Sequence, residues 1–340
     1  MAPSRLAPAA GESDRSVPGR AGALLVSFCN VGYGAGPFLA LVGVEDGRVE
    51  WVAPGEEAER SHRGVTGLCW HRAPGEAPLV AAAYQGAGGR GARRGEPTGQ
   101  AGTEAALRLL DPDLGFAPVS GAAIPRGVHS VCSDGCDLYV VVSREDTIYR
   151  ASPRGAVPRV GGGWDVQRHW VLPGSTGSDE NHLNAVGFAG ENGELCVSGF
   201  GRRPGDDWNA ATGGFVLGTV TGEKIIAPVH HPHSMLRDSG RIWTCESKTN
   251  RLVSDDGRAI PVGPSTYLRG LAAADGAFYA ASSKRRVVSE STGEPVKGAR
   301  AERWGRCELY RVDKETGSVE MLADFSGTRN EIYDVLPLPA

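Results

Sequence analysis

Six short stretches of this 340-residue chain resemble one another. Each begins with polar residues or a glycine and continues as an apolar strand. They recur at intervals typical of one four-stranded unit. Such a unit cannot bury both of its faces alone, so it needs a neighbour on each side. The spacing therefore predicts a six-bladed β-propeller. The six stretches are residues 64–68, 127–131, 182–186, 231–235, 267–271 and 331–335.

The segments between these stretches supply the remaining strands. Each of the first five is followed by three apolar runs of strand length separated by turn residues, with no room for a long amphipathic helix. In the second group, for example, we expect the fourth strand at residues 157–160. One strand is left over at the C-terminus, 332–337, and three at the N-terminus, 23–28, 38–44 and 49–53.

These leftover strands add up to one whole blade. We therefore expect an all-β propeller with four antiparallel strands per blade, whose ring closes when the C-terminal strand pairs with the three N-terminal strands. Closure also hides two sheet edges that would otherwise invite aggregation. Residues 1–20 are rich in Ala, Pro, Ser and Gly and predict a disordered tail, so a single domain is expected over 21–340.

Composition limits the partners and the compartment. The net charge of −4 offers no global field for nucleic acid or a membrane surface, and no segment approaches the roughly 20 apolar residues that cross a bilayer. The seven cysteines, an odd number, lie mostly in predicted strands and favour the reducing cytoplasm. We expect a small-molecule substrate, no nucleic acid and no membrane, while the oligomeric state stays open.

Polar side chains gather where the inner strands begin. Side chains two residues apart share one face of a strand, so two sets of side chains should point toward the channel. His129, His182 and His233 come from three consecutive blades, and we expect them to hold a divalent metal ion such as zinc, manganese or another transition ion. A single histidine there would more often be a hydrogen-bonded structural residue. The full sets are Thr66, His129, Asn184, His233, Arg269 and Tyr333, with His182, His231, Tyr267 and Glu331 two residues earlier.

Other groups near the same mouth suggest catalysis and substrate binding. Arg269 can hold a carboxylate or phosphate, or pair with Glu246 or Glu331. Glu246 and Tyr333 are candidates for moving a proton. Long connections at 85–104, 201–213 and 283–306 suggest a lid, or insertions that the surface tolerates. The candidate substrate-binding residues are Arg269, Asn184, Tyr267, Glu331 and Lys284.

Several segments resemble a bacterial family of six-bladed propeller proteins of unknown function, from about residue 125 to the C-terminus. They are 180–186, 232–235 with 241–247, 267–272 and 331–335. More distantly, the pattern is similar to metal-bearing propeller enzymes. Resemblance to the peptidyl-hydroxyglycine amidating lyase implies zinc on His129, His182 or His233, beside Tyr333 and Arg269. Resemblance to the gluconolactonase and regucalcin group implies an ion on Asn184, although the usual Asn-Gly pair after a proline is missing here.

The sequence thus predicts a metal-dependent lyase, isomerase or hydrolase that acts on a small polar or anionic metabolite at the channel mouth. In this hypothesis the ion polarises a carbonyl or activates water, Glu246 or Tyr333 moves a proton, and Arg269 holds a carboxylate. The alternative is a propeller that binds a ligand or a protein and catalyses nothing.

Overall fold

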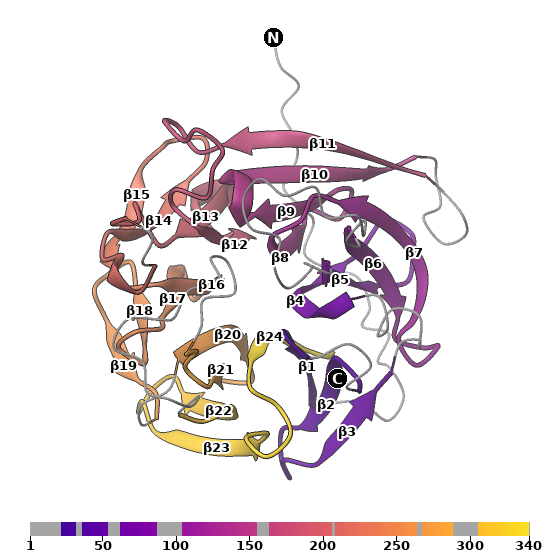
Figure 1. Ribbon diagram of the computed structural model, residues 1–340. Coiled ribbons are helices and arrows are strands. Elements are labelled where there is room, and N and C mark those ends of the chain that lie inside the picture. Colours follow the sequence, from indigo (N-terminus) through magenta and orange to yellow (C-terminus); the bar gives the residue numbers. More distant parts are fainter. Residues whose placement is uncertain are drawn as a thin grey trace.

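The computed structural model forms a ring of six blades around a central channel (Figure 1). Each blade is a four-stranded antiparallel sheet. The expected all-β, six-bladed propeller is confirmed. The structure describes residues 22–31, 36–53, 62–86, 104–154, 163–205, 208–263, 267–287 and 305–339, so the tail expected at residues 1–20 lies outside the described residues.

Five blades are continuous in sequence, and in each of them the inner strand comes first. One comprises β4 (His62–His71), β5 (Leu79–Gly86), β6 (Ala105–Asp111) and β7 (Ala117–Ile124). The next comprises β8 (Val128–Ser133), β9 (Leu138–Val142), β10 (Thr147–Pro153) and β11 (Trp164–Val171). It is followed by β12 (Leu183–Phe188), β13 (Leu195–Gly199), β14 (Gly214–Gly218) and β15 (Lys224–Val229). The last two comprise β16 (Pro232–Asp238), β17 (Arg241–Glu246), β18 (Arg251–Ser254) and β19 (Ala259–Pro261), then β20 (Tyr267–Ala274), β21 (Ala277–Ser283), β22 (Glu308–Asp313) and β23 (Val319–Asp324).

The sixth blade joins the two ends of the chain, as the sequence predicts. Its inner strand β24 (Ile332–Pro337) pairs with β1 (Ala23–Phe28), followed by β2 (Leu39–Gly43) and β3 (Val49–Val52). In this pairing Val26 lies opposite Val335. The backbone N–H of Asp334 also donates to Ser27 Oγ at 3.0 Å. Ring closure therefore involves a side chain as well as the β-ladder.

One strand expectation is wrong. The fourth strand of the second blade is β11, Trp164–Val171, which pairs with β10, whereas residues 157–160 lie outside the described residues. β11 is an outermost strand that buries none of its side chains fully. A search for apolar runs misses such a strand because an outer strand needs no continuous apolar stretch. By contrast, the second strand β9 is buried along its whole length between neighbouring blades.

A β-bulge interrupts the inner strand of every blade at nearly the same place. In five blades the extra residue belongs to the polar set predicted from the sequence, and in β16 it is Ser234, next to His233. A bulge re-aims side chains and often lies beside a functional site. The unpaired residues are Thr66, His129, Asn184, Ser234, Arg269 with Gly270, and Tyr333.

Glycine lets neighbouring inner strands approach closely at this level. A Cβ atom on Gly67 would lie 2.8 Å from the backbone nitrogen of Val131, and one on Gly270 would lie 3.0 Å from Cα of Asp334. Neither contact has room for a side chain. The bulges and these contacts thus bring the six strand starts together around the channel. Among the described residues, no helix is long and apolar enough to span a membrane.

Candidate functional site

The first position of the repeat has an unusual backbone conformation. Gly64 and Gly127 have φ angles of 142° and 93°, and in the next two blades His182 and His231 have φ angles of 48° and 55°. A left-handed conformation costs a residue with a side chain of the order of 1–3 kcal/mol. Histidine therefore occupies two positions where glycine would be less strained, and such strain is concentrated at functional sites.

His129 and His182 form the closest pair of imidazoles at the mouth. Their ring centroids are 4.9 Å apart and their planes meet at 83°. Nδ1 of His129 donates to the carbonyl of Gly127 at 2.9 Å, and Nδ1 of His182 donates to Asp179 Oδ1 at 2.9 Å. No described residue bonds to Nε2 of either ring. Each of these rings therefore presents a lone pair on Nε2.

Burial decides the charge of His129. Desolvation, with a smaller contribution from the neighbouring His182, lowers the pKa of His129 well below its ordinary value. His129 is therefore neutral at pH 7. In His182 the carboxylate of Asp179 fixes the tautomer and the orientation of the ring.

An aromatic wall encloses His182. The rings of Phe200 and Trp208 have centroids 4.8 and 4.7 Å from the imidazole. Trp208 begins a short 3-10 helix, Trp208–Ala210, in the connection between β13 and β14, and Lys248 Nζ donates to the carbonyl of Asn209 in the same connection. One of the three long connections thus lies over the mouth. Residues 87–103 and 288–304 of the other two lie outside the described residues.

His233 belongs to the same cluster but has both nitrogens engaged. Nδ1 bonds to Ser247 Oγ at 2.8 Å and to the carbonyl of His231 at 3.1 Å, and Nε2 accepts from Arg269 Nη1 at 3.0 Å. Desolvation and the guanidinium of Arg269 hold the pKa of His233 well below its ordinary value. His233 is therefore a neutral ring with a fixed tautomer, and it supports Arg269.

Arg269 lies at the end of the site that contains two guanidinium groups, those of Arg269 and Arg286. Its Cζ lies 5.0 Å from the ring centroid of Tyr333 and 5.1 Å from that of Tyr267. Its Nη2 lies 3.6 Å from Glu331 Oε2, so the expected ion pair forms with Glu331. Arg286 also donates to both oxygens of Glu331, with Nε 2.8 Å from Oε1. Two guanidinium groups thus share one buried carboxylate.

Asn184 and Tyr333 are among the buried polar side chains that have no hydrogen-bond partner in the described part of the chain. Both amide atoms of Asn184 and the hydroxyl of Tyr333 have none, although these residues are only 1% and 5% exposed. Leaving such a group unsatisfied costs about 1–3 kcal/mol. The rings of Tyr333 and His129 have centroids 5.8 Å apart, so the Tyr333 hydroxyl belongs to the same cluster. A ligand that bonds to these groups would recover the cost.

The tyrosines remain protonated at neutral pH. Desolvation raises the pKa of Tyr333 far above its ordinary value and raises that of Tyr267 to about 12. Tyr333 can therefore donate a hydrogen bond while it keeps its proton. The Tyr267 hydroxyl is already engaged at 2.7 Å with Nδ1 of His231, a ring whose pKa desolvation lowers to about 3.

Glu246 and Lys284 have other roles than those predicted. Glu246 accepts from Thr249 Oγ1, from Nε of Arg251 and, at 3.0 Å, from the backbone N–H of His230. These contacts connect β17 to its flanking turns, so we do not retain Glu246 as the general base. Nζ of Lys284 donates to the carbonyl of Ser326 at 2.7 Å and anchors the connection before β24.

The three-histidine metal set does not fit this arrangement. Nε2 of His233 accepts a hydrogen bond from Arg269. In the described ranges, no three His, Cys, Asp or Glu side chains are grouped so that they could hold an ion. Only Nε2 of His129 and of His182 stay open to a metal among the three. A bound zinc or manganese ion therefore remains a prediction of the sequence, and the chemistry proposed below uses only the side chains of the chain.

Metal analysis tests whether the three histidines bind a metal ion. We expect untagged protein to carry well under one equivalent of any divalent transition ion, and chelation to leave its melting temperature unchanged. Elemental analysis after gel filtration, with thermal melts before and after EDTA, gives both quantities. One tightly bound equivalent, with a fall in melting temperature on chelation, would restore the metal site.

Sequence analysis missed several residues of the site. Asp179 lies before β12, and Phe200, Trp208, Ser247 and Arg286 lie in the connections that follow second strands, which the repeat does not align. Asp179 had one local signal, because it lies three residues before His182. The other four residues had no such signal, because they reach the site through contacts between blades that the sequence does not show.

The fold and the cluster define a class, a six-bladed β-propeller with a polar site at one channel mouth. Residues 127–340 match a family model described as a domain of unknown function (DUF4915), and because this is more than half of the chain, the chain belongs to that family. The match begins near residue 125, where the resemblance to the bacterial propeller family also begins. No curated protein sequence matches the chain.

Solved structures share the architecture at low sequence identity. A chain in a crystal structure of a nidogen/laminin complex is 9% identical, with a TM-score of 0.53 over 92% of this chain and 97% of that chain. A Bacteroides fragilis protein, provisionally named a 6-phosphogluconolactonase, is 10% identical, with a TM-score of 0.54 over 95% of this chain and 99% of that chain. At such identities the likeness establishes the propeller fold alone.

Proposed function

We propose that the chain is an enzyme that binds a small anionic metabolite at this mouth and moves a proton on it, by lyase, isomerase or hydrolase chemistry. One observation carries the proposal. The Asp179–His182 pair, which can accept a proton, lies in the same ring cluster as Tyr333, which can donate a hydrogen bond to the reacting group. The two similar folds include a laminin complex and a provisional lactonase, so the fold itself does not decide between enzyme and binding module.

The charge distribution orients the substrate. At one end, Arg269 and Arg286 both approach the carboxylate of Glu331, and Nε of Arg269 has no hydrogen-bond partner among the described residues. The neighbouring His129 and His233 rings add no charge, because burial lowers the pKa of both. A carboxylate or phosphate on the substrate would bind to the Arg269 guanidinium. Its reactive part would then face the histidine pair.

The remaining groups have separate roles in this proposal. Nε2 of His182 takes a proton from a carbon or hydroxyl of the substrate, or from water, and Asp179 stabilises the resulting imidazolium. The hydroxyl of Tyr333 keeps its proton and donates a hydrogen bond to the oxygen that gains electrons. The amide of Asn184, which has no partner in the described residues, bonds to the substrate and fixes its position. The imidazolium of His182 then returns its proton to the substrate or to the leaving group, so the proton balance closes on His182.

Deuterium exchange tests the proposal before any substrate is known. We expect the protein, incubated in D2O with a set of small carboxylate and phosphate metabolites, to convert at least one of them or to exchange one of its C–H protons for deuterium. NMR and mass spectrometry detect either outcome. The His182→Gln variant should abolish it, whereas His230→Gln, which changes a histidine outside the ring contacts, should not.

The non-catalytic alternative has its own signature in the same experiment. A binding module would hold one of these anions, shown by a thermal shift, yet return it unlabelled and unchanged. His182→Gln would then leave its affinity intact. That combination of results would replace the enzyme by a binding propeller.

A further inference from the structure

The second half of the channel contains a separate cavity. It lies further along the inner strands than the imidazole cluster, has a volume of about 290 Å³, and is lined by residues from all six inner strands. Such a volume lies at the lower end of the range for small-molecule pockets. Most of its walls are apolar, including Leu68, Val131, Val186, Leu271 and Val335.

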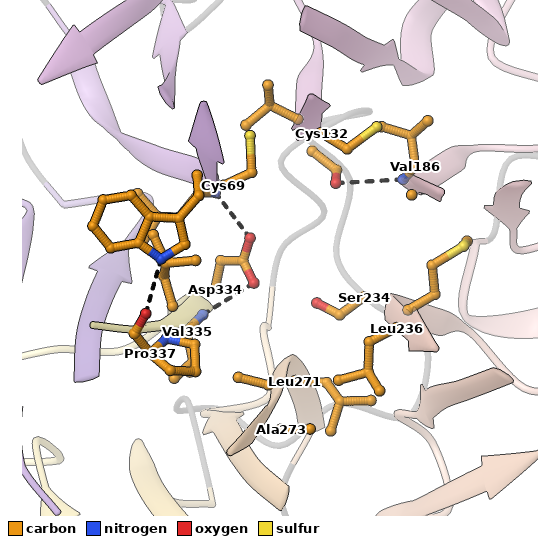
Figure 2. A pocket seen from close by; sticks show the side chains of 18 of the residues that line it. Cys69, Cys132, Val186, Ser234, Leu236, Leu271, Ala273, Asp334, Val335 and Pro337 are labelled. Atoms are coloured by element: carbon orange, nitrogen blue, oxygen red, sulfur yellow. Dashed lines mark hydrogen bonds between the residues drawn. The ribbon is translucent and has the colours of Figure 1, made fainter. Parts of the chain in front are cut away.

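One carboxyl group points into this cavity. Figure 2 shows Asp334 directed into the channel from one wall and the hydroxyl of Ser234 from another. Asp334 Oδ2 accepts from the backbone N–H of Leu68 at 2.9 Å, and Oδ1 accepts from that of Val335 at 3.0 Å. A carboxylate oxygen can accept more than one hydrogen bond. Both oxygens therefore keep acceptor capacity toward the cavity.

No described basic side chain compensates this carboxylate. Arg237 also lines the cavity, but its Nη1 donates to the carbonyl of Ala189 at 2.9 Å. Desolvation raises the pKa of Asp334 to about 7, against smaller opposing effects of the two backbone donors. An unpaired charge in a low-dielectric site is costly. A cationic partner would therefore strongly stabilise the ionised form of Asp334.

The other titratable groups around Asp334 are neutral thiols. Cys69 of β4, Cys132 of β8 and Cys245 of β17 all have pKa values that burial raises far above the ordinary thiol value. Protonated thiols are poor metal ligands, and one carboxylate is too few for calcium or magnesium. An organic cation with a short hydrocarbon part fits these surroundings better than a metal ion does.

We propose that this cavity binds a small primary ammonium compound, whose charged end pairs with Asp334 and Ser234 and whose hydrocarbon part lies against the apolar walls. No described residue bonds to the Ser234 hydroxyl, so it can accept a second N–H of the ammonium group. This site is independent of the proposed reaction at the other mouth. It shares none of the residues that the proposed reaction uses.

Calorimetry with n-pentylammonium chloride tests the proposal on the full chain. An alkylammonium stays charged at pH 8, as lysine does, so it should bind best when Asp334 is ionised. With the pKa of Asp334 at about 7, we expect roughly tenfold weaker apparent binding at pH 6 than at pH 8. At pH 6, titrations in two buffers of different ionisation enthalpy should show close to one proton released per ligand.

Three controls complete the experiment. The neutral 1-pentanol should bind at least tenfold more weakly than pentylammonium. Asp334→Asn should lose at least tenfold in pentylammonium affinity, whereas Asp113→Asn, at an exposed turn, should lose nothing. Equal binding of alcohol and ammonium, or ammonium binding without proton release at pH 6, would overturn the proposal. Proton release is measured on the unaltered protein, so the test holds even where Asp334→Asn does not fold.

Discussion

Replacement of His182 by glutamine is expected to lower kcat/KM by roughly 10²- to 10⁴-fold, the usual contribution of a positioned general base. Glutamine keeps a polar side chain against Phe200 and Trp208 but cannot take up the proton that Nε2 receives. Steady-state kinetics on the metabolite identified by deuterium exchange measures the effect. The melting temperature should change little, because His182 is a strained residue at the mouth.

Asp179→Asn separates a positioning role from mere packing. An amide can still bond to Nδ1 of His182 but cannot stabilise the imidazolium, so we expect kcat to fall, KM to change little, and the acidic limb of the kcat profile to move. A structural role would leave that profile unchanged. His230→Gln serves as the matched histidine control. Full activity in the His182→Gln variant would contradict the assignment of the base.

The repeat made most of the fold and part of the site predictable. Residues at equal positions of the six stretches lie at equal heights in the ring, so the proximity of His129 and Tyr333 follows from alignment. His182 lies two residues earlier in its stretch, and its place in the cluster follows only from the expectation that residues two apart share one face of the strand. The ring closure followed from counting strands. The outer strand β11 was missed because its side chains lie at the surface, where no apolar pattern is required.

The hydrogen-bond partners could not be predicted in the same way. Whether Nε2 of a histidine is open depends on groups from other blades, and Arg269, one blade further on, occupies that atom of His233. Glu246 shows a similar limit. It ends β17 facing the predicted mouth, but Arg251 lies directly opposite on β18, and this cross-strand pair holds the carboxylate in the blade.

A fall in pH from 7 to 5 is expected to reduce the free energy of unfolding by about 2 kcal/mol, because His231 and His233 remove about 4 kcal/mol and protonation of Asp334 in the folded chain returns about 2 kcal/mol. His231 and His233 are 3% and 2% exposed, and desolvation lowers the pKa of His231 to about 3 and that of His233 well below its ordinary value. Both rings stay neutral in the folded chain but bind protons in the unfolded chain below about pH 6.5. Each missing proton costs about 1.36 kcal/mol per pH unit over roughly 1.5 units.

Urea unfolding at pH 7, 6 and 5 measures this loss, and the variants show its source. His231→Gln should be less stable at pH 7 but lose about 2 kcal/mol less than the unaltered chain on acidification, whereas His230→Gln should follow the unaltered chain. Asp334 acts in the opposite direction over the same range, because its raised pKa means that the folded chain binds a proton below about pH 7 that the unfolded chain binds only near pH 4. The two histidines outweigh Asp334 on acidification, so stability should be highest near pH 7. A profile that does not fall from pH 7 to 5 would show that these imidazoles accept protons in the folded ring, and the neutral site described here would then be wrong.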